Sequence, residues 1–237
     1  MTIKEILQHT THRPWNLPDR SWKYYQEWNK AVFLHWCVAP EVLRKWLPSS
    51  LELDLYEGKA WVSVVAFTME KIRPSGLPPF PPVSDFHEIN IRTYVKYKGK
   101  SGVYFLSIEG GKQLSCFLAR NLSSLPYRYS RMTRIEGVYT SVNQKYGDTM
   151  TLNYNAGTAV SKKTALDLWL TERYALFQDT SSGISAFEIH HIPWPLYHLH
   201  TKETTIHYPR FSGLLSGAPH LMHYSTGVQV IAWDDPK

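Results

Sequence analysis

The chain has 237 residues, of which 43% are hydrophobic and 14% aromatic, a composition that supports a sizeable core and excludes a charge-rich disordered protein. The length favours a single domain over residues 1–237. Lysine and arginine exceed aspartate and glutamate by 26 to 20, and this net charge of +6 is compatible with an anionic ligand, nucleic acid or an acidic surface, or simply with solubility.

Residues 1–29 are predicted to form an aromatic-rich N-terminal arm that packs across the body of the protein. Trp22, Tyr25 and Trp28 have the spacing of one helical face. The arm lacks the apolar run of a signal peptide, and no segment approaches the ~20 apolar residues of a membrane span. We therefore predict a cytoplasmic protein without a membrane partner.

The next segment combines an apolar strand with a short helix. Residues 31–38 form a compact apolar run typical of a strand, and Pro40 begins a helix that is expected to stop at Pro48. Cys37 in this run and Cys116 further along have apolar neighbours and no zinc-like spacing. Both are therefore expected to be buried, reduced thiols.

The middle of the chain alternates between strand and loop patterns. β-branched residues over 60–67 and an alternating pattern over 88–97 predict two strands, and a glycine-containing turn joins the second to residues 103–108 in a hairpin. Residues 73–82 are interpreted as a stiff loop, because their prolines cannot donate ladder hydrogen bonds. An amphipathic pattern predicts a short helix over 113–122.

The second half of the chain is predicted to be mostly strand, at 137–144, 149–156, 185–192 and 228–233, with one helix over 165–174. Many antiparallel strands with a few short helices indicate the α+β class and a barrel or half-barrel. A barrel of this kind can enclose a central cavity.

Eight segments spread over nearly the whole chain carry a family resemblance. They are residues 12–15 (HRPW), 35–36 (HW), 51–54 (LELD), 60–62 (AWV), the proline-rich 73–82, 88–95 (EINIRTYV), 170–174 (LTERY) and 191–195 (HIPWP). Through them the chain is identified as a member of the YqjF-like family, a domain of unknown function in the acetoacetate decarboxylase-like superfamily. The resemblance implies that superfamily's fold, a barrel or half-barrel around a cavity, and it implies no particular activity.

A weaker resemblance to the acetoacetate decarboxylases themselves runs from Phe33 to Arg128. The segment 120–128 (RNLSSLPYR) is similar to their active-site segment, in which an arginine, a Leu-Ser pair and a proline lead into two lysines. In those enzymes the first lysine forms a Schiff base with the substrate ketone. Tyr127 and Arg128 occupy the two lysine positions in this sequence. Neither side chain can form an imine, so the resemblance implies the pocket without the Schiff-base reaction.

The other functional positions of the decarboxylases are largely replaced. Glu88 stands eleven residues before Gly99, the interval that separates the decarboxylases' catalytic glutamate from a hairpin glycine, so the resemblance carries that glutamate over to Glu88. Their pocket arginine falls near Asn29 and their second pocket glutamate near Ser63. One retained position of five argues against conserved chemistry.

Glu88 and Tyr127 are the candidate catalytic residues. A carboxylate inside a barrel can acquire a raised pKa and act as a general acid or base, and the Tyr127 phenol can donate a hydrogen bond. A second interpretation stays open, in which Glu88 pairs with Arg92 or Arg128 and only braces the barrel. Glu109, at the end of the next hairpin arm, could face the same cavity, but beside Gly110 it is interpreted as a surface glutamate.

Arg128 and Arg131 are the candidate ligand-binding cations, because a planar guanidinium suits a carboxylate or a phosphate. Both also fit solvated arginines or partners of surface acids. Trp36, Trp61 and Phe67 are predicted to contribute aromatic side chains to the cavity wall. His35 is a candidate for the same wall, although its apolar strand favours a hydrogen-bonded core histidine.

Three functions are compatible with these observations. The favoured one is binding of a small anionic organic ligand without a cofactor. The alternatives are an acid-base lyase or enolisation enzyme that uses Glu88, and a nucleic-acid-binding protein in which basic and aromatic residues interleave. The pairs His198/His200 and His220/His223 lack acidic or cysteine companions, so no metal site is predicted. A homo-oligomer stays open, because the related decarboxylases assemble into rings.

Overall fold

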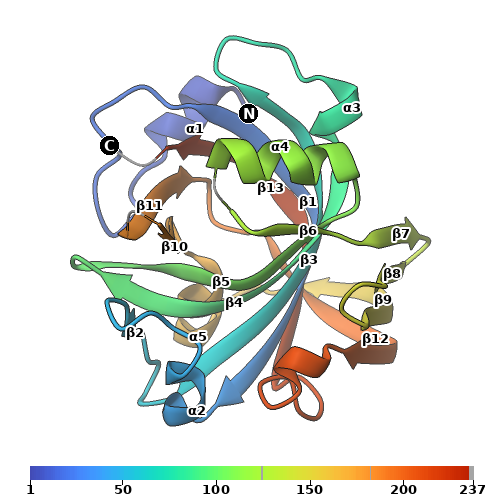
Figure 1. Ribbon diagram of the computed structural model, residues 1–237. Helices are drawn as coiled ribbons and strands as arrows, with labels where there is room; N and C mark the ends of the chain where they lie inside the picture. Colours follow the sequence, from blue (N-terminus) through green and yellow to red (C-terminus); the bar gives the residue numbers. More distant parts are fainter. Residues whose placement is uncertain (124, 182, 235–237) are drawn as a thin grey trace.

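Strands dominate the computed structural model, which describes residues 1–123, 125–181 and 183–234 (Figure 1). In chain order the strands are β1 (Tyr24–Val38), β2 (Glu52–Leu53), β3 (Ala60–Pro74), β4 (Phe86–Tyr97), β5 (Lys100–Gly110), β6 (Tyr127–Tyr129), β7 (Arg131–Ile135), β8 (Val138–Asn143), β9 (Asp148–Ala159), β10 (Ala175–Thr180), β11 (Gly183–His190), β12 (Leu196–His207) and β13 (Leu221–Trp233). The helices are α1 (Ile3–Gln8), α2 (Pro40–Arg44), α3 (Pro81–Ser84), α4 (Gln113–Ser123), α5 (Ala165–Thr171) and the 3-10 helix η1 (Pro209–Phe211). None of these helices is long and apolar enough to cross a membrane.

Seven of the strands form a ring. The pairings run from β1 through β3, β4, β5, β10, β11 and β13, and β13 returns to pair with β1. The pairings in this ring are antiparallel except that of β5 with β10, and β6 also runs parallel to β5. Gly102 lets β10 approach β5, because a Cβ there would lie 2.5 Å from the Ala175 carbonyl oxygen. The predicted barrel or half-barrel is confirmed, although it is not purely antiparallel.

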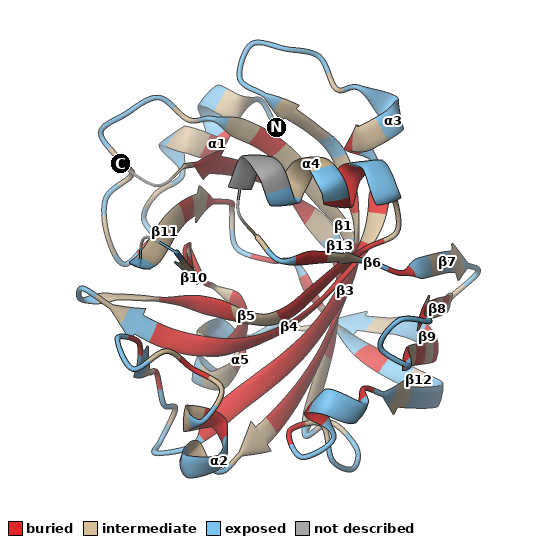
Figure 2. Ribbon diagram, viewed as in Figure 1, coloured by how far each residue is buried: buried red, intermediate tan, exposed pale blue. Residues whose placement is uncertain are grey.

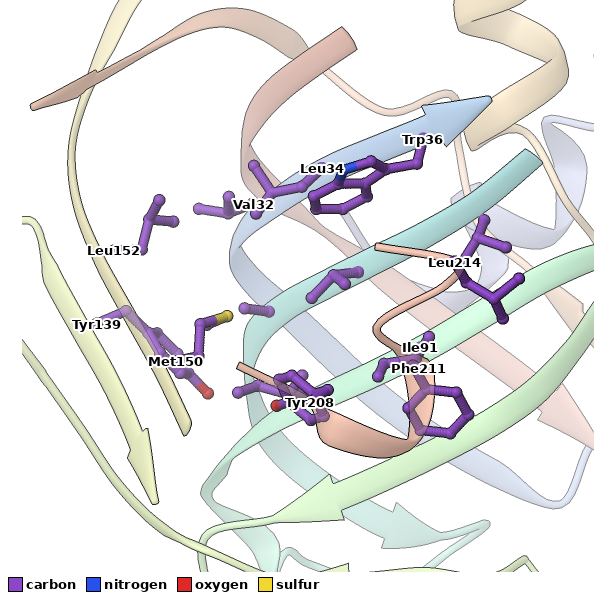
Figure 3. Close-up of a cluster of buried hydrophobic side chains, with 14 of the residues drawn as sticks. Val32, Leu34, Trp36, Ile91, Tyr139, Met150, Leu152, Tyr208, Phe211 and Leu214 are labelled. Carbon is purple, nitrogen blue, oxygen red and sulfur yellow. The ribbon is translucent and has the colours of Figure 1, made fainter. Parts of the chain in front are cut away.

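Long stretches of β3 and β4, and the second half of β1, are buried on both faces of the ring, as the colours of β3 and β4 show (Figure 2). Successive side chains of a strand point to opposite faces. On the outer face of the ring, Val64 and Ile91 join a large apolar cluster with residues of β8, β9 and η1, of which Tyr139, Met150, Leu152, Tyr208 and Phe211 appear in Figure 3. On the inner face, Val65 and Phe67 face the interior of the ring. From β13 the sheet continues beyond the ring through β12, β9, β8 and β7. These four strands cover one outer side of the ring as a second layer, so the whole sheet resembles a half-barrel.

The N-terminal arm is shorter than predicted, because residues 24–29 belong to β1. Tyr25 pairs with residues of β3 and β13, and Trp28 lies opposite Met69 of β3. The predicted helical face of Trp22, Tyr25 and Trp28 is therefore wrong. The remaining arm is fixed by Arg13, whose guanidinium lies 3.4 Å from the Glu188 carboxylate of β11.

The proline-rich segment is more ordered at its ends than predicted. Arg73 and Pro74 are the last residues of β3, and Pro81 begins α3. Proline is tolerated there because the first helical turn leaves its N–H groups unbonded in any case. Residues 75–80 lack regular structure, as predicted. Figure 1 shows α3 beside α4, which follows the next hairpin.

The predicted strands and helices mostly lie where the sequence patterns put them, and five of the described strands, β2, β6, β7, β10 and β12, were not predicted. β7 and β12 have mostly exposed or half-exposed side chains, so their sequences show no apolar alternation. β10 follows so closely on α5 that the helix predicted to reach Tyr174 ends at Thr171. Ser124, which falls in the decarboxylase-like segment, and Ser182 lie outside the described residues.

Candidate functional site

The interior of the ring contains a cavity of about 1110 Å³. Side chains from β1, β3, β4, β5, β10, β11 and β13 line it, together with Tyr127 of β6. Most of the wall is apolar or aromatic, and a polar cluster is formed by Glu88, Asn90 and Arg92 with Tyr127. A large concave site with few convergent polar groups is the usual form of a small-molecule site.

Three of these polar residues come from alternate positions of β4. Ile89 and Ile91 point into the outer apolar cluster, so Glu88, Asn90 and Arg92 must point into the ring. The alternating pattern identified β4 in the sequence, and the polar face of this strand is directed toward the cavity rather than toward solvent.

Glu88 and Tyr127, the two predicted catalytic residues, are in direct contact. The Tyr127 hydroxyl donates a hydrogen bond of 2.7 Å to Glu88 Oε2, and Asn90 Nδ2 donates one of 3.3 Å to Oε1. Glu88 is only 2% exposed, and this burial raises its pKa from 4.5 to about 7, against the opposing effect of the two hydrogen bonds. Burial and the neighbouring Glu88 raise the pKa of Tyr127, so its phenol stays protonated and remains a donor.

Arg92 is a buried cation without a counter-ion in the described part of the chain. Its side chain lies in the cavity wall, the residue is 7% exposed, and its Nη2 donates a long hydrogen bond of 3.5 Å to the Leu170 carbonyl oxygen. Its Nε has no hydrogen-bond partner, and none of the ion pairs among described residues includes Arg92. The structure therefore does not show Glu88 paired with Arg92 or Arg128, which was the second interpretation of Glu88.

A second arginine of the cavity wall, Arg173, differs in having a carboxylate partner, Asp54, which the half-exposed Lys96 also contacts at 3.4 Å. Its Nη1 lies 2.6 Å from Asp54 Oδ2, and its Nε donates to the Trp169 carbonyl oxygen at 2.6 Å. Nη2 has no hydrogen-bond partner. Arg173 can thus add a hydrogen bond to a ligand, while Arg92 supplies the uncompensated charge.

Residues 25–229 match the family model DUF2071, described as an uncharacterised conserved protein. The chain belongs to the DUF2071 family. It is 34% identical over 226 residues to the uncharacterised protein YqjF of Bacillus subtilis, a match that covers 92% of this chain and 93% of that protein. The predicted membership of the YqjF-like family is confirmed.

Solved structures similar to this DUF2071 chain include acetoacetate decarboxylases and related enzymes. Acetoacetate decarboxylase from Legionella pneumophila matches with a TM-score of 0.60 at 14% identity, over 95% of this chain and 92% of that one. The enduracididine biosynthesis enzyme MppR, in complex with the condensation product of pyruvate and imidazole 4-carboxaldehyde, matches with a TM-score of 0.56 at 12% identity, over 91% and 88%. At these identities the likeness shows the fold alone, and the predicted acetoacetate decarboxylase-like fold is confirmed.

Arg128 and Arg131 are not among the described residues that line the cavity of this DUF2071 protein. Arg128 forms ion pairs with Glu109 at 2.7 Å and Asp148 at 3.0 Å, and Arg131 is exposed at the start of β7. On β5, Ile108 faces the cavity, so its neighbour Glu109 points to the opposite side. The interpretation of Glu109 as a surface residue is wrong, since it is 1% exposed.

His35, Trp36 and Trp61 are all buried, and none of them borders the cavity. His35 bonds to Ser63 Oγ at 2.6 Å, as expected for a core histidine, and Trp36 belongs to the outer apolar cluster. Trp61 packs in a separate cluster near α5. Phe67, the third predicted aromatic residue, does line the cavity, and the rest of the aromatic wall comes from residues that include Trp28, Phe105, Phe187 and Trp194.

A chain of buried polar side chains holds the Leu170 carbonyl that Arg92 contacts. Tyr94 donates to this carbonyl at 3.0 Å, Ser63 bonds to Tyr94 at 2.6 Å, and His35 bonds to Ser63. His223 continues the chain to Asp167, with its Nε2 3.0 Å from Asp167 Oδ1. No group of three or more His, Cys, Asp and Glu side chains among the described residues is arranged to hold a metal ion.

Asn90 and Arg92 were missing from the predicted site. The pattern that contains them, alternating with Ile89 and Ile91, was visible in the sequence, but it does not reveal which face of the strand meets solvent. Only closure of the ring turns this polar face inward.

Proposed function

We propose that this protein binds an organic carboxylate in the ring cavity and that Arg92 holds the carboxylate group. The observation that carries this proposal is the buried Arg92 guanidinium, which meets no carboxylate among the described residues. An unpaired charge inside a protein costs several kcal/mol, and a bound carboxylate would offset that cost through charge-assisted hydrogen bonds.

The proposed binding does not involve a Schiff base. An imine requires a lysine amine that is desolvated or otherwise held neutral. Lys23 is the one lysine among the described residues that line the cavity, and it lies at the exposed rim. Its side chain is 53% exposed and pairs with Asp234 at 3.2 Å. Lys23 is therefore not the desolvated lysine that imine formation requires.

The contact between Glu88 and Tyr127 supports a second candidate function, acid-base catalysis on the bound ligand. In its carboxylate form, Glu88 would remove a proton from a carbon next to a ligand carbonyl. The electron pair of the C–H bond would form a C=C bond, and the π pair of the carbonyl would move onto its oxygen. Glu88 would then hold the proton and return it to the same or another carbon. A carboxyl group with a pKa of about 7 exchanges protons readily in both directions near neutral pH.

The nucleic-acid alternative has less support. Basic and aromatic residues interleave over residues 22–25 (WKYY) and 127–129 (YRY). Tyr25 and Tyr127 are both buried, whereas Tyr129 is exposed. Stacking of successive single-stranded bases needs several exposed rings side by side. The burial of the two tyrosines removes part of each proposed stacking surface.

Replacing Arg92 with glutamine is expected to weaken carboxylate binding by at least about thirtyfold, because the charged partner is lost from a buried site. The measurement is a thermal-shift screen against monocarboxylates, hydroxy acids and oxo acids, followed by calorimetric titration of the hits. Arg92→Met should in addition raise the free energy of unfolding of the ligand-free protein by about 1 to 3 kcal/mol, because a buried unpaired charge is removed. Arg131→Gln, the same change at an exposed arginine, is the control and should leave both quantities unchanged. Equal affinity in Arg92→Gln would contradict the proposal.

Glu88→Gln separates an enzyme from a binding protein. A glutamine side chain could not accept the proton, so the variant should lose turnover of any substrate identified in the screen while keeping ligand affinity within a few-fold. Single-turnover kinetics and calorimetric titration measure the two effects. Turnover at the unaltered rate in the variant would exclude Glu88 as the acid-base group.

A further inference from the structure

We infer that the ligand is an amphipathic monocarboxylate, with one carboxylate at Arg92 and a large apolar tail along the aromatic wall of the ring. The inference rests on the proposed function, in that Arg92 holds the carboxylate. It adds the number of charges on the ligand and the size and polarity of the rest of the molecule.

The charges that line the cavity can balance one negative charge on a ligand. Lys23 and Asp234 pair with each other at the rim, and Arg173 pairs with Asp54, which leaves Arg92 and Glu88. Glu88 adds no positive charge in either protonation state. A ligand with two negative charges would therefore leave at least one of them unbalanced in a buried site, which is costly.

The cavity is far larger than a short acid requires. Ligand cavities of roughly 300–1,000 Å³ hold drug-sized molecules, and this cavity measures about 1110 Å³. It is also long. Arg92 lies opposite Ser63 of β3, whereas Tyr24, at the rim, lies opposite Pro74, eleven residues further along that strand. At about 3.3 Å per residue this is roughly 35 Å of curved strand.

The wall beyond Arg92 is suited to an apolar tail. Trp28, Phe67, Met69, Phe187 and Trp194 all line the cavity. Along β3, Val65 lies opposite Asn90 and Phe67 opposite Glu88, and Met69 lies further along, opposite Phe86. A three- or four-carbon acid at Arg92 would leave most of this surface uncovered. A ligand that covers it gains binding free energy with each methylene that leaves water.

The test is calorimetric titration of the purified full chain with straight-chain monocarboxylates from propanoate to decanoate. The dissociation constant is expected to fall roughly fourfold per added methylene, the value for transfer of one methylene out of water. Arg92→Gln should weaken every member by the same factor, because it acts on the carboxylate, and should leave the dependence on chain length intact. Dicarboxylates of equal length should bind at least about tenfold more weakly than the monocarboxylates.

The outcomes separate the inference from the function on which it rests. Affinity that depends on Arg92 but not on chain length would overturn the inference and leave the proposed function standing. If dicarboxylates bind as tightly as monocarboxylates of equal length, the inference that the ligand carries a single negative charge is overturned. Binding that is independent of Arg92, or no binding at any length, would overturn the proposed function together with the inference.

A second variant tests the wall independently of the charge. Val65→Phe adds a ring that points into the cavity. The variant should therefore leave the affinity for propanoate unchanged and reduce the increase in affinity that the longest acids show over propanoate. Because short and long acids are compared in the same variant, a general loss of folded protein cannot imitate this result. If the affinity of the variant rises from propanoate to decanoate as steeply as that of the unaltered protein, the tail does not lie along this wall and the inference is overturned.

Discussion

Replacing Arg128 with glutamine is expected to lower the free energy of unfolding by about 3 kcal/mol and to leave carboxylate affinity unchanged. Arg128 is 16% exposed in its side chain and pairs with Glu109 and Asp148, whose side chains are 1% and 3% exposed. Removing the cation leaves two buried carboxylates without their partner, one of the more destabilising changes a single substitution can make. Urea denaturation at pH 7 measures the loss, and calorimetric titration measures the affinity.

Two further variants control this prediction. Arg131→Gln, three residues along the chain and exposed, should change stability by less than about 0.5 kcal/mol. Combining Arg128→Gln with Glu109→Gln should recover part of the lost stability, because one of the two unpaired carboxylates is also removed. Burial raises the pKa of both Glu109 and Asp148, so the penalty should shrink as the pH falls and the carboxyls become neutral. A large loss of ligand affinity in Arg128→Gln would instead return Arg128 to the binding site.

The different environments of Tyr127 and Arg128 explain why the sequence assigned only one of them to the cavity correctly. The resemblance to the decarboxylases identified both positions, but neighbouring residues of a strand face opposite sides. In β6 the inward side belongs to Tyr127, which reaches Glu88. Arg128 faces the acidic residues on the other side of β5. Which residue points inward depends on the parallel pairing of β6 with β5, which no local pattern reveals.

The local parts of the fold were predictable and the closure of the ring was not. Residues 88–97 and 103–108 form the expected hairpin because their alternation and the turn between them are encoded within a short stretch. The pairings of β1 with β13 and of β5 with β10 join residues that are far apart in the sequence. These two pairings create the interior, so the inward direction of Asn90 and Arg92 could not be inferred before them.

Replacing Glu88 with glutamine is expected to make the protein's stability relative to the unaltered chain depend strongly on pH. Burial raises the pKa of Glu88 from 4.5 to about 7, so the folded state holds its proton more tightly than the unfolded chain does. The stabilisation from this proton is fully present below pH 4.5 and is lost as the pH rises toward 7. A rise of this size corresponds to about 3 kcal/mol. Glutamine cannot ionise, so the variant should gain about that much relative stability between roughly pH 4 and pH 8.

Urea denaturation of both proteins across this pH range measures the difference directly, because the contributions of all other titrating groups cancel in it. Glu203→Gln makes the same change at an exposed position of β12 and should give a difference below about 0.5 kcal/mol at each pH. A flat difference for Glu88→Gln as well would mean that Glu88 ionises in the folded protein as easily as in water. The cavity would then be too well hydrated to keep Glu88 protonated near neutral pH, and the proposal of acid-base catalysis would lose its physical basis. A difference that rises between pH 4.5 and about 7 would instead establish that the cavity holds a carboxyl group able to give up and take back a proton near neutral pH.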